Sequence, residues 1–390
     1  MNKKNRMACS GTNKASLVKN IGGYDRWLLM SATALIIIGI LMVASASMEI
    51  AEKTYHNNLH FFYRQLGFGF FGFLAAIIAL RIKMEWWLKA SPYLLLATYL
   101  MLIVVLIPGI GRQINGSRRW LGLAGFGGQV SELAKVFWVL FLAGFLQRRQ
   151  KEIIQSPYGL LKPMVLLSGI VLLLLLEPDF GAAVVLISVT LGLLFIAGVP
   201  LRYYAMLFAA VFFAVVALAF ASPYRLERLT AFLNPWANQF GSGYQLTQSL
   251  IAFGRGGWFG LGLGDSVQKL FYLPEAHTDF LFAVLAEELG FIGVVVVMML
   301  FVILLFRVLR TSYHALIQKL HYPAYCAAGL GLCLAFEASI NIGVNTGVLP
   351  TKGLALPFIS YGGSSLMVNC LVIAILLRAD FETRKQKRRR

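Results

Sequence analysis

The chain alternates between long apolar runs and shorter polar connections. Ten of the runs approach the roughly 20 residues that a helix needs to cross the hydrocarbon core of a bilayer. They cover residues 27–47, 60–80, 90–108, 131–147, 163–177, 180–199, 204–222, 280–306, 322–346 and 355–377. Strand-like alternation is absent, and lipid does not tolerate exposed irregular backbone. The pattern predicts an all-α integral membrane protein, a polytopic bundle of ten transmembrane helices.

Two connections are much longer than the others. They are residues 109–130 and, between the seventh and eighth spans, residues 222–279. Long loops in a compact domain are usually functional. The predicted organisation is therefore a basic tail (1–26), a ten-span domain (27–377) whose two long loops share one face, and a second basic tail (378–390).

Composition supports the membrane assignment. Hydrophobic residues make up 58% of the chain and charged residues only 13%, whereas soluble domains average about a quarter charged. A soluble enzyme is excluded. The net charge of +18 would indicate nucleic acid binding in a soluble protein, but in a membrane protein such an excess records topology. We expect no nucleic acid partner, and the four cysteines show neither disulfide nor zinc spacing.

The basic residues also predict the orientation. Lysines and arginines precede the first span and crowd the last seven positions of the chain, which read Arg384-Lys-Gln-Lys-Arg-Arg-Arg390. Basic residues accumulate on the cytoplasmic side of a membrane. Both termini are therefore predicted to be cytoplasmic, and the two long loops face outward.

The first outer loop carries arginines that oppose this rule. It contains Arg118, Arg119 and Trp120, and the following span begins with Glu132 and Lys135 on one helix face. Arginine binds phosphate in a bidentate manner and tryptophan packs on apolar tails, so an anionic amphiphile fits these residues. Anchoring of a helix end in the headgroup layer, and a salt bridge between Glu132 and Lys135, are the structural alternatives.

The second outer loop ends in a carboxylate next to an apolar run. Arg225 and Arg255 lie within the loop, and Pro274-Glu-Ala-His277-Thr278-Asp279 closes it. Thr278 is predicted to cap the following helix, with Asp279 in the first turn. An ionised carboxylate at a membrane surface can act as a general base, although helix capping alone also explains it.

Acids and one lysine occur at further positions in the last spans. Glu287, Glu288 and Glu337 lie within predicted helices, where acids line cavities or bond across helices. The last outer segment contains Lys352, Ser360 and Ser364 among prolines and glycines, and resembles the broken helices of transporters.

Together these segments resemble the SEDS family (shape, elongation, division and sporulation). The resemblance rests on Pro274-Glu-Ala-His-Thr-Asp279, Ser360-Tyr-Gly-Gly-Ser-Ser365, Arg118-Arg119-Trp120 and Ser131-Glu-Leu-Ala-Lys135, and extends over essentially all ten spans. The segment Asn345–Leu354 is more similar to the division members than to the elongation members. Gly128-Gln129-Val130-Ser131 departs from the Gln-Pro-Ser of many members, which leaves the local turn in doubt.

The resemblance implies an inverting peptidoglycan glycosyltransferase that polymerises lipid II at the outer face of the bacterial inner membrane, at the division septum. Asp279 would be the general base on the acceptor 4-hydroxyl, and undecaprenyl pyrophosphate the leaving group. Implied substrate-binding residues are Arg118, Arg119, Trp120, Glu132, Lys135, Arg225, Arg255, His277, Thr278, Lys352, Ser360 and Ser364.

The implied partners are lipid II, a class B penicillin-binding protein transpeptidase and other divisome membrane proteins. A divalent cation, Mg²⁺ or Mn²⁺, is expected to help with the pyrophosphate, although the sequence shows no metal-ligand cluster. Two alternatives stay open at this point. One is a lipid II flippase that uses Glu287, Glu288 and Glu337, and the other is a scaffold that only recruits the transpeptidase.

Overall fold

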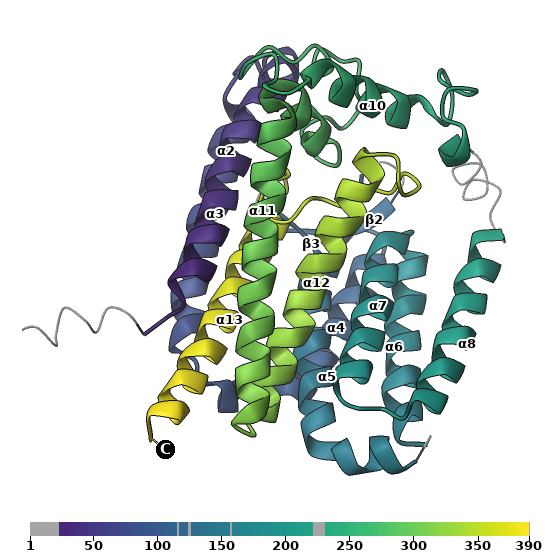
Figure 1. The fold of residues 1–390 in the computed structure, drawn as a ribbon. Coiled ribbons are helices and arrows are strands. Elements are labelled where there is room, and N and C mark those ends of the chain that lie inside the picture. Colours follow the sequence, from purple (N-terminus) through teal and green to yellow (C-terminus); the bar gives the residue numbers. More distant parts are fainter. Residues whose placement is uncertain (1–22, 115–116, 124–125, 157, 221–230, 390) are drawn as a thin grey trace, which may run out of the picture.

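The computed structural model describes residues 23–114, 117–123, 126–156, 158–220 and 231–389. Within these residues, ten helices run along a bundle and an eleventh, α10 (Tyr244–Gly256), lies across one end (Figure 1). The ten are α2 (Arg26–Tyr55), α3 (His60–Arg81), α4 (Met84–Leu106), α5 (Val130–Gln155), α6 (Tyr158–Leu176), α7 (Phe180–Ile196), α8 (Leu201–Phe220), α11 (Leu281–Ile317), α12 (His321–Asn345) and α13 (Gly363–Arg389).

Each predicted span overlaps one of these helices, which confirms the multi-pass helical class. In the described residues, eight helices are long and apolar enough to cross a membrane, while α7 and the first part of α8, Leu201–Ala214, are shorter apolar helices. The last predicted span begins too early, because residues 346–362 form turns and irregular backbone and α13 starts at Gly363. This helix also continues to Arg389, so most of the predicted basic tail is helical.

The first long loop adds a feature that the all-α prediction missed. Strands β1 (Gly111–Ile114), β2 (Ser117–Leu123) and β3 (Phe126–Gln129) form an antiparallel sheet in the order β1-β2-β3. Its strands are short and rich in glycine, so they lack the sustained alternation by which a strand is recognised. Gly122 of β2 lets the Arg112 side chain of β1 lie close to the strand, since an added Cβ would stand 2.5 Å from Arg112 Nε and would displace it.

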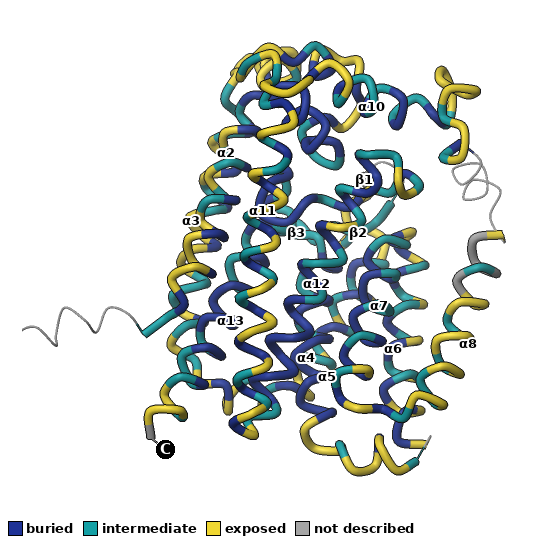
Figure 2. The backbone as a smooth tube through the Cα atoms, viewed as in Figure 1, coloured by how far each residue is buried: buried dark blue, intermediate teal, exposed yellow. Residues whose placement is uncertain are grey.

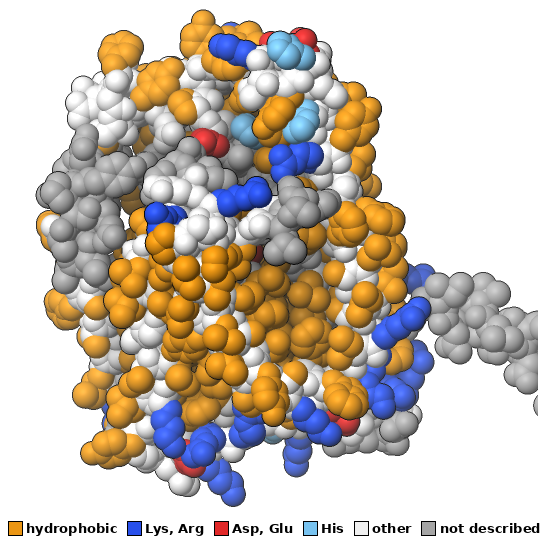
Figure 3. Space-filling model, turned by 180° about the vertical axis from the view of Figure 1, so that it is seen from behind, with side chains coloured by type: hydrophobic (Ala, Val, Ile, Leu, Met, Phe, Trp, Pro, Cys, Tyr) orange, Lys and Arg blue, Asp and Glu red, His pale blue; other side chains and the backbone are white. Residues whose placement is uncertain are grey.

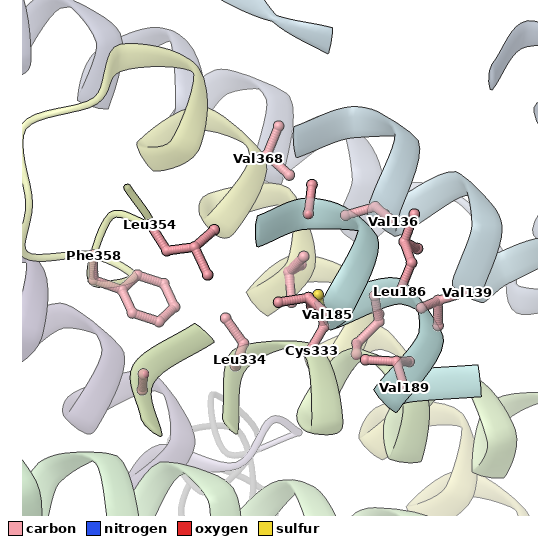
Figure 4. Packing of buried hydrophobic residues seen from close by; sticks show 14 of the residues in the cluster. Val136, Val139, Val185, Leu186, Val189, Cys333, Leu334, Leu354, Phe358 and Val368 are labelled. Atoms are coloured by element: carbon pink, nitrogen blue, oxygen red, sulfur yellow. The ribbon is translucent and has the colours of Figure 1, made fainter. Parts of the chain in front are cut away.

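The core lies where α5, α7 and α12 pack together. Figure 2 shows the buried positions concentrated in the middle of the bundle, and Figure 4 shows Val136 and Val139 of α5 beside Val185 of α7 and Leu334 of α12. Close approach depends on small residues. A Cβ added to Gly329 of α12 would lie 2.6 Å from Val139 Cγ1. The central helices therefore form a tightly packed platform.

The two described chain ends lie together. Asp25 caps α2 by accepting from Trp27 N at 3.0 Å, and it also pairs with Arg307 of α11 and with Arg384 of α13. We call this the basic end of the bundle, defined by Asp25, Arg307 and Arg384. The opposite end, which carries the sheet and α10, is the loop end. Chain ends on one side agree with an even number of spans.

Candidate functional site

Asp279 lies at the loop end, in the irregular segment before α11, and is half-buried. Its backbone carbonyl accepts from Asn341 Nδ2 at 2.9 Å and from Asn345 Nδ2 at 3.0 Å, both on α12. Its carboxylate lies against Gly353, since a Cβ added there would lie 2.9 Å from Asp279 Oδ2. The carboxylate is thus held between the end of α12 and the segment that follows it.

The predicted capping arrangement was wrong. Helix α11 begins at Leu281, after Asp279, and Thr278 donates to Glu275 Oε2 at 2.7 Å rather than capping the helix. A residue from another helix takes over this role, because Asn345 Oδ1 accepts from Ala283 N at 3.2 Å. One asparagine therefore accepts from an N–H of the first turn of α11, which it shares with the Phe280 carbonyl, and also holds the Asp279 carbonyl.

His277 and Ser360 join the same segments. Tyr361 N donates to His277 O at 3.0 Å, and the His277 ring packs 5.0 Å from Phe61 and 5.6 Å from Tyr361 between ring centres. Burial lowers the pKa of His277, which favours the neutral imidazole. Ser360 Oγ accepts from Leu356 N at 2.9 Å, and Ser364 is buried in the first turn of α13. These contacts fix the loop that carries Asp279.

The turn between α6 and α7 connects the sheet to this region. Arg119 of β2 donates to the carbonyls of Glu177, at 3.0 Å, and Pro178. Asp179 accepts from Ser131 Oγ at 2.8 Å and from Gln129 Nε2 at 3.2 Å. The unusual Gln129-Val130-Ser131 sequence is thereby fixed at the start of α5, and the doubt about this turn is resolved.

Lys352 reaches the same turn from the other side. Its Nζ lies 4.3 Å from the centre of the Phe180 ring at the start of α7. Because Gly353 touches Asp279 and Lys352 touches Phe180, the Asp279 segment and the sheet are connected through residues 177–181. The structure therefore brings Asp279, Lys352 and Arg119 into one region.

A buried charge cluster lies one helical turn below Ser131. Lys135 Nζ pairs with Glu132 Oε1 at 2.9 Å and with Glu337 of α12. Lys135 is 2% exposed, and a cavity of about 10 Å³ adjoins the cluster, which is space for about one water. The salt bridge between Glu132 and Lys135, which was the structural alternative to substrate binding, is present, and the contribution of Glu337 could not be foreseen from spacing along the chain.

The other two acids anchor the second long loop. Glu287 accepts from Ser266 Oγ and from Gln268 N, the latter at 3.2 Å. Glu288 accepts from Ser45 Oγ at 2.7 Å and pairs with Lys269 Nζ at 3.0 Å. Both acids are fully buried. They tie residues 264–269 to α11 and α2, so their partners are structural.

The remaining predicted residues are more dispersed. Arg118 lies half-buried on β2, opposite Gln113, and Trp120 pairs with Gln129 of β3. Arg255 ends α10, is 43% exposed and lies 3.6 Å from Glu287 Oε1. Arg225 falls outside the described residues. No group of three or more His, Cys, Asp or Glu side chains able to hold a metal occurs in the described residues.

Three residues at the site were missed by sequence reasoning. They are Asn341 and Asn345, which hold the Asp279 carbonyl, and Gly353, which touches its carboxylate. The spacing of the two asparagines in the sequence was a possible indication of their role. Amides four residues apart in a largely apolar helix share one face and need partners there. Nothing in the sequence indicated that this face meets Asp279.

These features define a class of protein: a multi-pass helical membrane protein in which a carboxylate and several cations gather at one end of the bundle. The family model described as cell cycle protein, which covers FtsW, RodA and SpoVE, matches residues 26–385. The chain therefore belongs to this family, the SEDS family of the sequence resemblance.

Relatives and solved structures agree with the assignment. The chain is 54% identical over 363 residues to a probable peptidoglycan glycosyltransferase FtsW of Legionella pneumophila, covering 93% of this chain and 92% of the relative. For the protein of that name from Coxiella burnetii, identity is 55% over 360 residues, covering 92% and 97%.

Among solved structures, RodA of Thermus thermophilus has a TM-score of 0.69 at 28% identity, covering 93% of this chain and 98% of that one. A chain from a structure entitled "Structural coordination of polymerization and crosslinking by a peptidoglycan synthase complex" has a TM-score of 0.77 at 29% identity, covering 92% and 98%.

Proposed function

We propose that the protein is a peptidoglycan glycosyltransferase of the division type, which polymerises lipid II into glycan strands. The observation that carries the proposal is the setting of Asp279. Its carbonyl is clamped by two asparagines and its carboxylate lies against Gly353, next to Lys352. A carboxylate held in this way at the end of a membrane bundle is suited to general base catalysis.

In the proposed reaction the acceptor 4-hydroxyl attacks C1 of the donor sugar. Asp279 takes the hydroxyl proton as the new C–O bond forms. The bond from C1 to the pyrophosphate breaks with inversion, and undecaprenyl pyrophosphate leaves with the electron pair. Because pyrophosphate is already a good leaving group, no second carboxylic acid is needed, in contrast to the acid–base pairs of glycosidases.

Charge on the departing pyrophosphate requires cations. Lys352 is the cation connected to Asp279 through its neighbour Gly353, and Arg118 and Arg255 are partly exposed at the same end. Arg119 donates to two backbone carbonyls, so we assign it to support of the sheet. A divalent cation stays a prediction. The described residues offer no cluster of ligands for it.

The topology and partners belong to the same proposal. We place ten spans in the bacterial inner membrane, with the basic end in the cytoplasm, the loop end outside and the protein at the division septum. Figure 3 supports the membrane placement and the orientation, since a hydrophobic band crosses the molecule and Lys and Arg line its lower edge. A class B penicillin-binding protein transpeptidase and other divisome proteins are the proposed partners, in line with the solved synthase complex.

The flippase alternative is less well supported. It requires acids that exchange protons, but Glu287, Glu288 and Glu337 each have a basic partner, with Arg255, Lys269 and Lys135 respectively. A scaffold without activity leaves the setting of Asp279 unexplained.

The experiment is lipid II polymerisation by the purified protein with its transpeptidase partner. Asp279→Asn keeps the shape of the side chain and removes the base. We expect loss of glycan products together with unchanged lipid II binding and an unchanged melting temperature. As a matched control, Asp265→Asn changes a carboxylate in the same loop and is expected to keep activity. Polymerisation at the unmodified rate by Asp279→Asn would exclude Asp279 as the base.

A further inference from the structure

A pocket at the basic end of the bundle lies far from Asp279 and has no role in the proposed reaction. It has a volume of about 500 Å³ and lies where the end of α3 meets the start of α4. Its lining residues are Arg81, Ile82, Lys83, Trp86, Trp87 and Ala90. Ligand pockets commonly have about 300–1,000 Å³. The space is sufficient for a polar headgroup and the first part of an attached chain.

Cations surround this pocket without acidic partners. Arg81 and Lys83 are exposed in its lining, and Lys89 lies nearby on α4 with its Nζ 5.6 Å from the centre of the Trp86 ring. Within the described ranges, no carboxylate pairs with any of these three cations at 4.0 Å or less. Three unneutralised cations around one pocket favour an anionic ligand.

The two nearby acids, Glu382 and Glu85, form no ion pair with these three cations. Glu382 of α13 accepts from Met84 N at 3.1 Å and pairs with Arg378 at 2.8 Å. Glu85 is exposed in the first turn of α4. The partial positive charge at the first turn of α4 is offset by the partial negative charge at the last turn of α3, so the side chains decide the balance. The local balance of charge therefore remains positive.

The tryptophans contribute an apolar wall and an unused donor. Trp86 is 64% exposed, which is typical of a ring at the boundary between lipid and water. Trp87 is mostly buried, and its Nε1 has no hydrogen-bond acceptor among the described residues. A buried N–H without a partner costs free energy. Because Nε1 is closed off from solvent, an oxygen of a ligand in this pocket would supply the acceptor once the ring turns toward the pocket.

We propose that this pocket binds the headgroup of an anionic phospholipid, such as phosphatidylglycerol, from the leaflet at the basic end. The phosphate lies between Arg81 and Lys83, a headgroup or ester oxygen accepts from Trp87 Nε1, and the acyl chains extend along the exposed apolar faces of α3 and α4. Basic pockets between membrane helices on the cytoplasmic side are suited to anionic headgroups. Figure 3 shows the Lys and Arg side chains along this edge of the hydrophobic band.

The test is a lipid titration of the full-length protein in neutral detergent, followed by native mass spectrometry. The probes are phosphatidylglycerol, phosphatidylethanolamine and sn-glycerol 3-phosphate. The double variant Arg81→Gln/Lys83→Gln removes two cations from the pocket. We expect it to bind phosphatidylglycerol about thirtyfold more weakly, because each basic residue at an anionic headgroup contributes about fivefold.

A matched control makes the same charge change elsewhere at the basic end. The double variant Lys151→Gln/Arg202→Gln removes two exposed cations, one of which lies 4.6 Å from the ring of Tyr203, and is expected to bind phosphatidylglycerol as the unmodified protein does. Trp87→Phe keeps the ring and removes the N–H, so we expect weakening of about fivefold. If Arg81→Gln/Lys83→Gln fails to fold, phosphatidylglycerol binding by Trp87→Phe tests the proposal instead.

Three results would overturn the proposal. The first is equal weakening by the pocket variants and the control, which would indicate general electrostatic attraction. The second is equal binding of phosphatidylethanolamine and phosphatidylglycerol. The third is displacement of the lipid by an equal concentration of sn-glycerol 3-phosphate, which would indicate a site for a free phosphate rather than for a lipid.

Discussion

Gly353→Ala tests whether the position of the Asp279 carboxylate controls the reaction. Gly353 is exposed and its φ lies outside the left-handed region, so alanine fits the backbone. The new Cβ would stand 2.9 Å from Asp279 Oδ2, whereas ordinary contacts begin at 3.4 Å. The carboxylate must therefore move by about 0.5 Å while its charge and its hydrogen-bonded carbonyl stay as they are.

The size of the effect follows from this displacement. A misplacement of about 1 Å at a catalytic group costs roughly a hundredfold in rate, so about half of that displacement is expected to cost about tenfold, or about 1.4 kcal/mol in activation free energy. The assay is the initial rate of lipid II polymerisation at saturating lipid II. Lipid II binding and the melting temperature are measured alongside and should not change.

One control separates this mechanism from a general effect of the substitution. Gly254→Ala on α10 adds a Cβ that meets nothing within 4 Å and should keep the full rate. A full rate in Gly353→Ala, or an equal loss in Gly254→Ala, would refute the reasoning.

The remaining predictions concern buried charges and the clamp. Lys135→Met leaves the acids Glu132 and Glu337 unpaired and should destabilise the protein by about 3–5 kcal/mol, seen as a lower melting temperature in detergent, whereas Glu132→Gln should cost less because Lys135 keeps Glu337. Burial of the Glu177 carboxyl, together with the smaller effect of the nearby Asp179 charge, raises the pKa of Glu177 from 4.5 to about 8. Between pH 4.5 and about 8 the folded protein therefore keeps the Glu177 proton, whereas the unfolded chain has released it. The stability that Glu177 contributes is full below pH 4.5, falls as the pH rises and is lost by about pH 8. Glu177→Gln should flatten that decline in melting temperature, and a profile identical to that of the unmodified protein would count against it. Asn345→Ala removes both the cap of α11 and one bond to the Asp279 carbonyl, and should lower the polymerisation rate more than Asn341→Ala, which leaves the cap in place.

The helices were the part of the fold most accessible from the sequence. A span of about 20 apolar residues needs no partner to be recognised, because the bilayer imposes both its length and its internal hydrogen bonding. Their ends were less certain. Helix α13 starts at Gly363, although the predicted span begins at residue 355, because prolines and glycines before Gly363 keep the backbone irregular.

The candidate site shows a similar division. Glu132 and Lys135 could be paired from their spacing, since residues three apart share a helix face. The cap of α11 was misassigned to Thr278, because a local cap is the only kind that spacing along the chain reveals, whereas Asn345 reaches the helix from 62 residues away.

The sequence by itself determined the membrane class, the positions of the helical segments and a set of charged residues set apart in long loops. Local hydropathy and residue chemistry suffice for these, because the bilayer acts on each segment separately. Only the tertiary structure decided which charges are structural and which remain for chemistry. Arg119 is bound to two carbonyls, Glu287 is hydrogen-bonded to the buried Ser266 and Glu288 is paired with the buried Lys269, while Asp279 is held against Gly353. Those contacts join residues far apart in the chain, and their formation depends on how the helices pack.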